Sequence, residues 1–393
     1  MGETMDYSKK NKIDIFLIFV FLVVFPFGQL LRKTININGF QLAFNSSDIV
    51  VGIIFLYSLY KQFNFFAKVK IFRGFIYAAL FSLVISIFLF NYKLVFLGAL
   101  YFIRVLLYIN FFAFCKNVLN KRKGLILNSL IAVTTFSAIF GWIQYLLWPD
   151  LRPLYSLGWD DHYYRLVGAF LDPGFTGIIL VLGLVSVIYK YFFKRDNRLL
   201  LLVAFFIISI AFTYSRASYL ALSAALVYIA ISTKKFWKIV VVGIFSLSIV
   251  YFLPNPGGQG VNLARQYSII ARLENYTQTV NIFEKSPLFG VGFNNICLAK
   301  QKYIESFKWD SHSCSGSDSS ILLILATTGI VGFIIFTDCL VKLFSLMGKG
   351  YYKNIFIASS IALFFHSLFH NSLFYSWVMG YFAMLLSIQK FKE

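Results

Sequence analysis

The sequence carries little charge for its length, and this absence decides the class of protein. Only 13% of its 393 residues are charged, whereas an ordinary globular domain carries roughly a quarter. Hydrophobic residues make up 59% of the chain, and Phe alone occurs 47 times. Because no soluble core of this length could bury so many large apolar side chains, the composition excludes a soluble globular protein. It predicts an all-α polytopic membrane protein, with a single integral membrane domain over residues 1–393.

Groups that bind metals or form disulfides are also scarce. The chain has four Cys and four His, with no CxxC pair and no Cys–His spacing typical of a metal site. We therefore expect no metal and no other cofactor. Cys297 and Cys314 fall in one predicted outer loop, and the sequence leaves open whether they pair in an oxidising compartment.

The apolar runs predict about twelve transmembrane helices. The first run has no small-residue cleavage site, so we expect a retained span rather than a signal peptide. Several runs are shorter than the roughly 20 residues that cross a bilayer, which predicts tilted or kinked segments. The predicted helices lie near residues 13–31, 46–60, 71–90, 94–114, 124–147, 174–189, 199–214, 217–232, 239–253, 319–341, 355–371 and 373–389.

The basic residues predict the orientation of these helices. They give the chain a net charge of +20, which in a soluble protein would suggest nucleic acid but in a membrane protein first reports topology. Lys and Arg cluster in every second connection, beginning with Lys9, Lys10 and Lys12. The positive-inside rule then places both termini in the cytoplasm. With the charge explained by topology, we expect no nucleic-acid partner.

Two long polar segments are predicted on the outer side of the membrane, at residues 148–173 and 254–318. Together they hold nine of the 16 acidic residues. Long polar loops carried by rigid spans are where sites are commonly built. Any active site should therefore face the periplasm or the cell exterior.

Arg216 is the sharpest single feature of the sequence. It lies between two apolar runs with no room for a loop, at the predicted outer membrane face. A charge within a span is costly and usually faces a polar cavity, and the planar guanidinium suits a phosphate better than Lys does. The alternative is an Arg that extends to the lipid headgroups.

Three further arginines are candidates for the same chemistry. Arg165 stands where the first outer loop re-enters the membrane, just before Asp172, which should cap the next helix with Pro173 in its first turn. A surface ion pair with a neighbouring Asp would also explain Arg165. Arg272 opens a stretch whose apolar residues recur at helical spacing and predict an amphipathic helix on the outer face. Arg265, seven residues earlier, should share a face of that helix.

The last polar strip before the span at 319–341 contains two possible bases. Asp318 is placed to cap that helix, and capping alone would explain it. His312 is a lone loop imidazole. Within the spans, Arg104 needs a partner and should face the interior rather than lipid. His370 should line a cavity near the outer end of its helix, whereas its spacing of four from His366 is a weak metal signal.

Four segments in the same order resemble the bacterial O-antigen polymerase and O-antigen ligase superfamily. The resemblance covers roughly residues 160–335 and agrees with the predicted topology. The segments are Arg165…Gly168…Phe170…Pro173, Thr213-Tyr214-Ser215-Arg216, Arg272…Ser286-Pro287-Leu288-Phe289-Gly290-Val291-Gly292, and Asp318…Leu322…Leu325…Gly329…Gly332.

This resemblance implies a protein of the cytoplasmic (inner) membrane that carries out an inverting glycosyl transfer on the outer side of that membrane. Substrates would be oligosaccharides linked to a polyprenyl (undecaprenyl) diphosphate, which is the leaving group. Arginines matching Arg216 and Arg272 would hold the diphosphate as its charge develops, with Arg165 and Arg265 as further candidates. A base would take the proton of the acceptor hydroxyl, and a chain-length regulator is a further candidate partner.

One departure separates the two branches of the superfamily. Ligases typically place a His eleven residues before the Gly that matches Gly329, and here that position is Asp318. An acidic residue there resembles polymerases, so we expect a polymerase of repeat units. The base stays open between Asp318 and His312. The alternatives are an O-antigen ligase, which passes the glycan to lipid A–core, and a polysaccharide transporter or flippase, which should show ionisable residues near the midplane of both halves.

Overall fold

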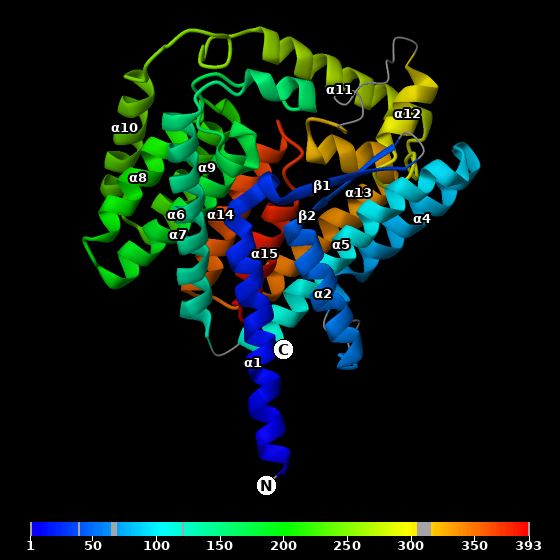
Figure 1. The fold of residues 1–393 in the computed structure, drawn as a ribbon, viewed down its shortest axis with the longest axis horizontal. Helices are drawn as coiled ribbons and strands as arrows, with labels where there is room; N and C mark the ends of the chain where they lie inside the picture. Colours follow the sequence, from blue (N-terminus) through cyan, green and yellow to red (C-terminus); the bar gives the residue numbers. More distant parts are fainter. Residues whose placement is uncertain (1, 38–39, 64–68, 120–121, 305–315, 392–393) are drawn as a thin grey trace.

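The computed structural model describes the chain except for residues 1, 38–39, 64–68, 120–121, 305–315 and 392–393 (Figure 1). Each of the twelve predicted apolar segments forms a helix. These helices are α1 Gly2–Val24, α2 Ser46–Tyr60, α4 Arg73–Leu89, α5 Tyr92–Leu119, α6 Lys123–Leu147, α7 Pro173–Lys194, α8 Leu199–Ala211, α9 Arg216–Thr233, α10 Phe236–Tyr251, α13 Ser320–Leu346, α14 Tyr351–Ser367 and α15 Ser376–Ser387.

Seven helical stretches in the described part of the chain are long and apolar enough to cross a membrane. Four shorter apolar helices, α2, α8, α10 and α15, accompany them. The expected class, an all-α polytopic membrane protein, is therefore confirmed. The count of twelve spans and the cytoplasmic position of both termini stay predictions.

The first span ends in structure that the apolar pattern did not indicate. After α1 the chain continues as the 3₁₀ helix η1, Phe25–Leu31, and then as an antiparallel hairpin of β1, Arg32–Ile37, and β2, Phe40–Asn45. Gly28 has φ +51°, and a Cβ on it would lie 2.4 Å from the Ala169 carbonyl oxygen. Only glycine allows this close approach between the first span and the short helix η4, Gly168–Phe170.

Helix α7 is the central helix of the bundle. Its residues from Pro173 to Tyr189 are buried except for Phe175, and it packs against α6, α8, α9 and α14. Its start is as predicted: Asp172 Oδ1 accepts a hydrogen bond of 2.8 Å from the backbone N–H of Phe175, and Pro173 is the first helical residue. The loop that precedes α7 is thereby tied to the middle of the bundle.

Two helices of the second long polar segment, α11 Tyr267–Lys285 and α12 Ile296–Tyr303, cover the end of the bundle opposite the N-terminus (Figure 1). Residues 286–292 link them and cross α13 at a kink. There the Val291 N–H donates to the Ala326 carbonyl over 3.0 Å, and the Ile330 N–H to the Pro287 carbonyl over 2.8 Å. Gly329 has φ +69°, and a Cβ on it would lie 2.3 Å from the Leu288 carbonyl oxygen. The glycine thus lets two backbones meet and fixes α11 beside α13.

Two expectations about helix ends and faces were wrong. Ser319, not Asp318, caps α13, since its hydroxyl accepts from the Leu322 N–H at 3.3 Å. Arg265 precedes α11, which begins at Tyr267, so it shares no helical face with Arg272.

The amphipathic helix itself is present, but its apolar residues do not all face the protein. Leu273 and Val280 are exposed, whereas Thr279 and Ile282 are buried. The reason is that polar side chains, not only apolar ones, attach α11 to its neighbours: Tyr276 donates its phenol hydrogen to the Leu368 carbonyl at 2.5 Å.

The cysteines divide into two kinds. Cys115 and Cys339 are free and buried, and Cys297 is disulfide-bonded. Cys314, the partner that the sequence suggested, lies outside the described residues.

Candidate active site

Arg216 is the first residue of α9, directly after the Ser215 cap. One terminal nitrogen of its guanidinium donates to the carbonyls of Leu263 (3.3 Å) and Arg265 (3.1 Å), and the other donates to the Ser268 hydroxyl (2.6 Å). Arg216 therefore connects the tight turn before α9 to the segment that leads into α11.

Arg165 and Arg265 converge on the same tight turn. Arg165 donates to the carbonyls of Thr213 (3.0 Å) and Tyr214 (3.3 Å), and Arg265 donates to the Tyr214 carbonyl (3.4 Å) and to that of Gly260 (2.8 Å). Arg165 is only 8% exposed, which excludes the exposed surface pair as its explanation.

Arg272 reaches the site from α11. Its guanidinium contacts Nε2 of His370 at 3.2 Å. One turn later on the same helix, Asn275 Oδ1 accepts from the backbone N–H of Asp318 at 2.9 Å. Helix α11 thus brings Arg272 and Asp318 to one place, although 46 positions separate their numbers.

Positive charge in this arginine cluster (Arg165, Arg216, Arg265 and Arg272) is not balanced by direct pairing. Within the described residues, the ion pairs join other partners, and none links these arginines to a carboxylate. Burial, followed by the neighbouring Arg216 and Arg272, lowers the pKa of Arg265 to about 10. Burial and the nearby Arg265 lower the pKa of Arg165 to about 10 as well. An anion bound among them would relieve this repulsion.

Asp318 lies on the edge of the arginine cluster. Burial raises its pKa, while Arg272 and Lys300 oppose that shift. We expected a helix N-terminus to weaken it as a base, but it does not cap α13, and desolvation dominates. The other candidate base, His312, lies outside the described residues.

A second group of ligand-type side chains adjoins the arginine cluster and was not visible in the sequence spacing. One ligand atom each of Asp160, His162 and Asp172 lies within 4.8 Å of the others, a grouping that could hold a metal ion. His162 is 6% exposed, and neither ring nitrogen has a hydrogen-bond partner among the described residues. Burial first, then Arg165, lowers the pKa of His162 to about 4, so the imidazole is neutral near pH 7.

His370 lies beside the arginine cluster, in contact with Arg272. It stands in the segment that follows α14 rather than on the helix itself. Its ring stacks on that of His366, with centroids 5.0 Å apart. The two ring nitrogens of His366 contact the hydroxyls of Ser372 (2.6 Å) and Ser218 (3.4 Å). This arrangement is a hydrogen-bonded stack in the core and gives no support to a metal pair.

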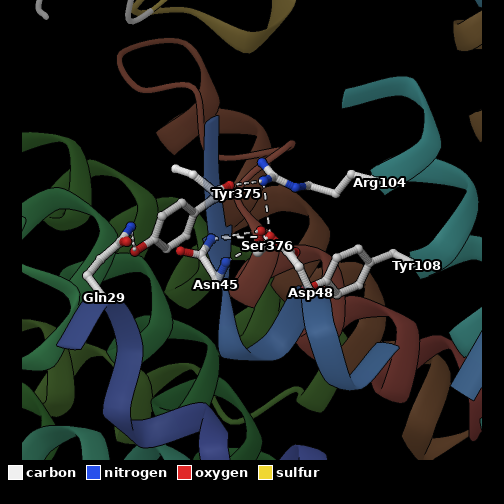
Figure 2. Close-up of polar contacts among 8 residues, drawn as sticks. Gln29, Asn45, Asp48, Arg104, Tyr108, Tyr375 and Ser376 are labelled. Atoms are coloured by element: carbon white, nitrogen blue, oxygen red, sulfur yellow. Dashed lines mark hydrogen bonds and ion pairs between the residues drawn. The ribbon is translucent and has the colours of Figure 1, made fainter. Parts of the chain in front are cut away.

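Arg104 faces the protein interior, as expected, but it lies in a different place. Its guanidinium is 3.0 Å from Asp48 and donates to the Ala43 carbonyl at 3.1 Å. The Tyr108 hydroxyl donates to the same Asp48 carboxylate at 3.0 Å. Figure 2 shows these groups converging where β2 meets α2, beside Tyr375 and Ser376.

The comparison with known proteins agrees with the resemblance seen in the sequence. Residues 200–337 match the sequence profile of a family described as O-antigen ligase. No curated protein matches the chain. The matched region includes Arg216, Arg265, Arg272 and Asp318, whereas Arg165 and His370 lie outside it. This match over residues 200–337, together with the apolar helices, supports a similarity to the O-antigen ligase and polymerase superfamily of membrane proteins.

Proposed function

We propose that the chain is a membrane glycosyltransferase that polymerises oligosaccharide repeats linked to a polyprenyl diphosphate into O-antigen or capsular-type polysaccharide. The reaction takes place at the outer face of the cytoplasmic membrane. The observation that carries this proposal is the arginine cluster, in which Arg216, Arg265 and Arg272 lie together without carboxylate partners in the described residues. A partly buried carboxylate, Asp318, stands beside it.

The hydrogen-bond donors that remain free suit a diphosphate. A guanidinium has five N–H donors. Within the described residues, Arg272 uses one for His370, so most of its donors are left for a ligand. Counted over the same residues, Arg216 uses three, for Leu263, Arg265 and Ser268, and keeps two. Forked donors of this kind bind phosphate oxygens in pairs.

The transfer then requires two events at the anomeric carbon. The bond to the diphosphate oxygen breaks, and the negative charge that develops on this oxygen is stabilised by the arginines. The acceptor hydroxyl attacks from the opposite face and inverts the configuration, while its proton passes to a base. Asp318 is our choice for that base because its raised pKa makes it a stronger base than an exposed carboxylate.

An apolar cavity of about 600 Å³ supports a polyprenyl substrate. It is lined by side chains of α5, α13, α14 and α15, and its rim includes Ser367 and Leu373. The Ser367 carbonyl accepts from the Ser319 hydroxyl (3.3 Å), and the Leu373 N–H donates to the Ser320 hydroxyl (3.2 Å). The cavity therefore reaches the residues that follow Asp318, where a lipid chain can continue from a diphosphate.

The matched family is described as O-antigen ligase, so the ligase is the second candidate. A ligase would transfer a finished glycan to lipid A–core or another acceptor. The acidic residue at position 318, where ligases typically have His, favours the polymerase.

The polysaccharide phenotype of a deletion strain separates the two functions. We expect single repeat units on the acceptor lipid, because ligation continues without polymerisation. Complete absence of glycan from the acceptor lipid would instead identify a ligase. Polysaccharide of normal amount and length would refute both.

A further inference from the structure

We propose that His370, with the space left by Gly174, is a positioning residue that holds Arg272 in place for the diphosphate. The inference rests on the proposed function in one respect, the assignment of Arg272 as a ligand of the leaving group. It adds two residues to the site that no sequence pattern indicated in this role.

The contact between the two side chains is specific. Arg272 Nη2 lies 3.2 Å from His370 Nε2, and it is the one hydrogen bond of this guanidinium within the described residues. Arg272 comes from α11, whereas His370 follows α14. A long arginine side chain loses much conformational freedom when it is ordered. One fixed acceptor selects its rotamer before substrate arrives, which is the condition for effective stabilisation of a developing charge.

The contact with Arg272 determines the tautomer and the protonation state of His370. A guanidinium only donates, so Nε2 must present its lone pair and the proton must reside on Nδ1. Burial first, then the charges of Arg272 and Arg165, lowers the pKa of His370 to about 3. The ring is therefore neutral near pH 7, as an acceptor must be.

The ring is held from several sides. It stacks on His366 with an interplanar angle of 19°. It also forms a T-shaped contact with Phe175, with the two ring centroids 5.9 Å apart. On the α7 side it lies against Gly174, where a Cβ would come within 2.6 Å of its Cε1 and Nε2 atoms. Gly174 thus leaves room for the atom that accepts from Arg272, and a methyl group there must displace the ring.

The stack of His366 and His370 is also connected to Arg216. His366 contacts the Ser218 hydroxyl at 3.4 Å, and that hydroxyl donates to Ser215, the cap before Arg216, at 2.9 Å. Both arginine-bearing helices, α9 and α11, are therefore in contact with this pair of histidines.

The test is a double-mutant cycle on the purified full-length protein with a lipid-diphosphate oligosaccharide as substrate. We expect His370→Ala to lower kcat and kcat/KM together by about 10- to 100-fold, the scale of a small displacement of a catalytic group. His370→Gln, which keeps an acceptor, should recover much of the rate. In an Arg272→Ala background, His370→Ala should have no further effect.

Gly174→Ala provides an independent route to the same displacement. It should lower kcat as His370→Ala does, and it should also be silent in the Arg272→Ala background. Gly243→Ala is the matched control, because a Cβ at Gly243 meets no atom within 4 Å. If the His370→Ala protein does not fold, His370→Gln and Gly174→Ala carry the test.

The outcomes separate this inference from the proposed function. Full activity of Arg272→Ala would overturn the diphosphate assignment and the positioning role with it. If Arg272→Ala is inactive but His370→Ala is harmless, the positioning role alone is wrong. It is also wrong if the His370→Ala loss in rate is the same in the Arg272→Ala background as in the native protein.

Discussion

Arginines are held away from bulk solvent in two parts of the molecule, and the two parts differ in how the charge is balanced. In the N-terminal half, Arg104 meets the carboxylate of Asp48 (Figure 2). It also contacts the Ala43 carbonyl and the ring of Tyr101. In the arginine cluster, Arg216 and Arg272 bond to carbonyls, a hydroxyl and an imidazole, and to no described carboxylate. The first charge is neutralised by the fold, whereas the second leaves a net positive field.

This difference indicates that the arginines have different roles in the two parts of the molecule. A buried ion pair costs desolvation and repays it only through its partner, so its loss is expressed as instability. Arginines without a carboxylate repel one another, and a bound anion relieves the repulsion. We therefore expect Arg104 to matter for folding and the arginine cluster to matter for the chemical step.

The largest effect should come from the unpaired arginines. Arg272→Ala should lower polymer formation by about 1,000-fold, because a donor to the leaving diphosphate is lost. Arg216→Lys should also be severe, since Lys keeps the charge but not the forked donors. Polymer length and amount are measured at matched protein levels. Arg152→Ala is the control, because Arg152 is exposed and pairs with Asp150. Normal polymer in the Arg272 and Arg216 variants would contradict the assignment of the arginine cluster to the chemical step.

The next largest effect concerns the base beside the cluster. Asp318→Asn should lower the rate by about 100-fold or more, because the acceptor hydroxyl loses its proton acceptor. A base must be deprotonated, and burial raises the pKa of Asp318. Activity should therefore rise with pH through a pKa that lies above the ordinary value of an Asp side chain.

The comparison variant for this prediction is His312→Ala. It should leave the acid limb of the pH profile unchanged. If His312→Ala abolishes polymer while Asp318→Asn is active, His312 is the base.

The paired arginine should show the opposite behaviour. Arg104→Met leaves the buried Asp48 carboxylate without its cationic partner and should lower the free energy of unfolding by about 3–5 kcal/mol. Thermal unfolding in detergent measures this change, and the transfer rate per folded molecule should be nearly unchanged. Adding Asp48→Asn should restore much of the stability. A stable Arg104→Met protein with a collapsed rate would instead place Arg104 in substrate binding.

The smallest effect should come from removing divalent cations. The arginines can neutralise the diphosphate, so we expect transfer by the purified protein to persist in a chelator. Activity that disappears with chelator and returns with a divalent cation would contradict this. The group formed by Asp160, His162 and Asp172 would then be the first place to look, and His162→Gln would show whether the ion binds there.

Features that depend on residues close together in the chain were predictable from the sequence. The class of protein, the twelve helical segments and the cap at Asp172 follow from apolar runs and local hydrogen bonding. So does the position of Arg216 at a helix start, since two runs without a loop leave room only for a tight turn.

Only the tertiary structure decided which distant groups meet. The contact of Arg272 with His370 joins residues 98 positions apart, and that of Arg104 with Asp48 joins two different helices. Asp318 failed as a cap because Asn275, on α11, holds its N–H while Ser319 takes that place. The contacts of α11 are accompanied by close approaches at Gly329, where two backbones meet, and at Gly174, where the His370 ring packs. No local pattern encodes such packing, because it depends on the shape of both surfaces at once.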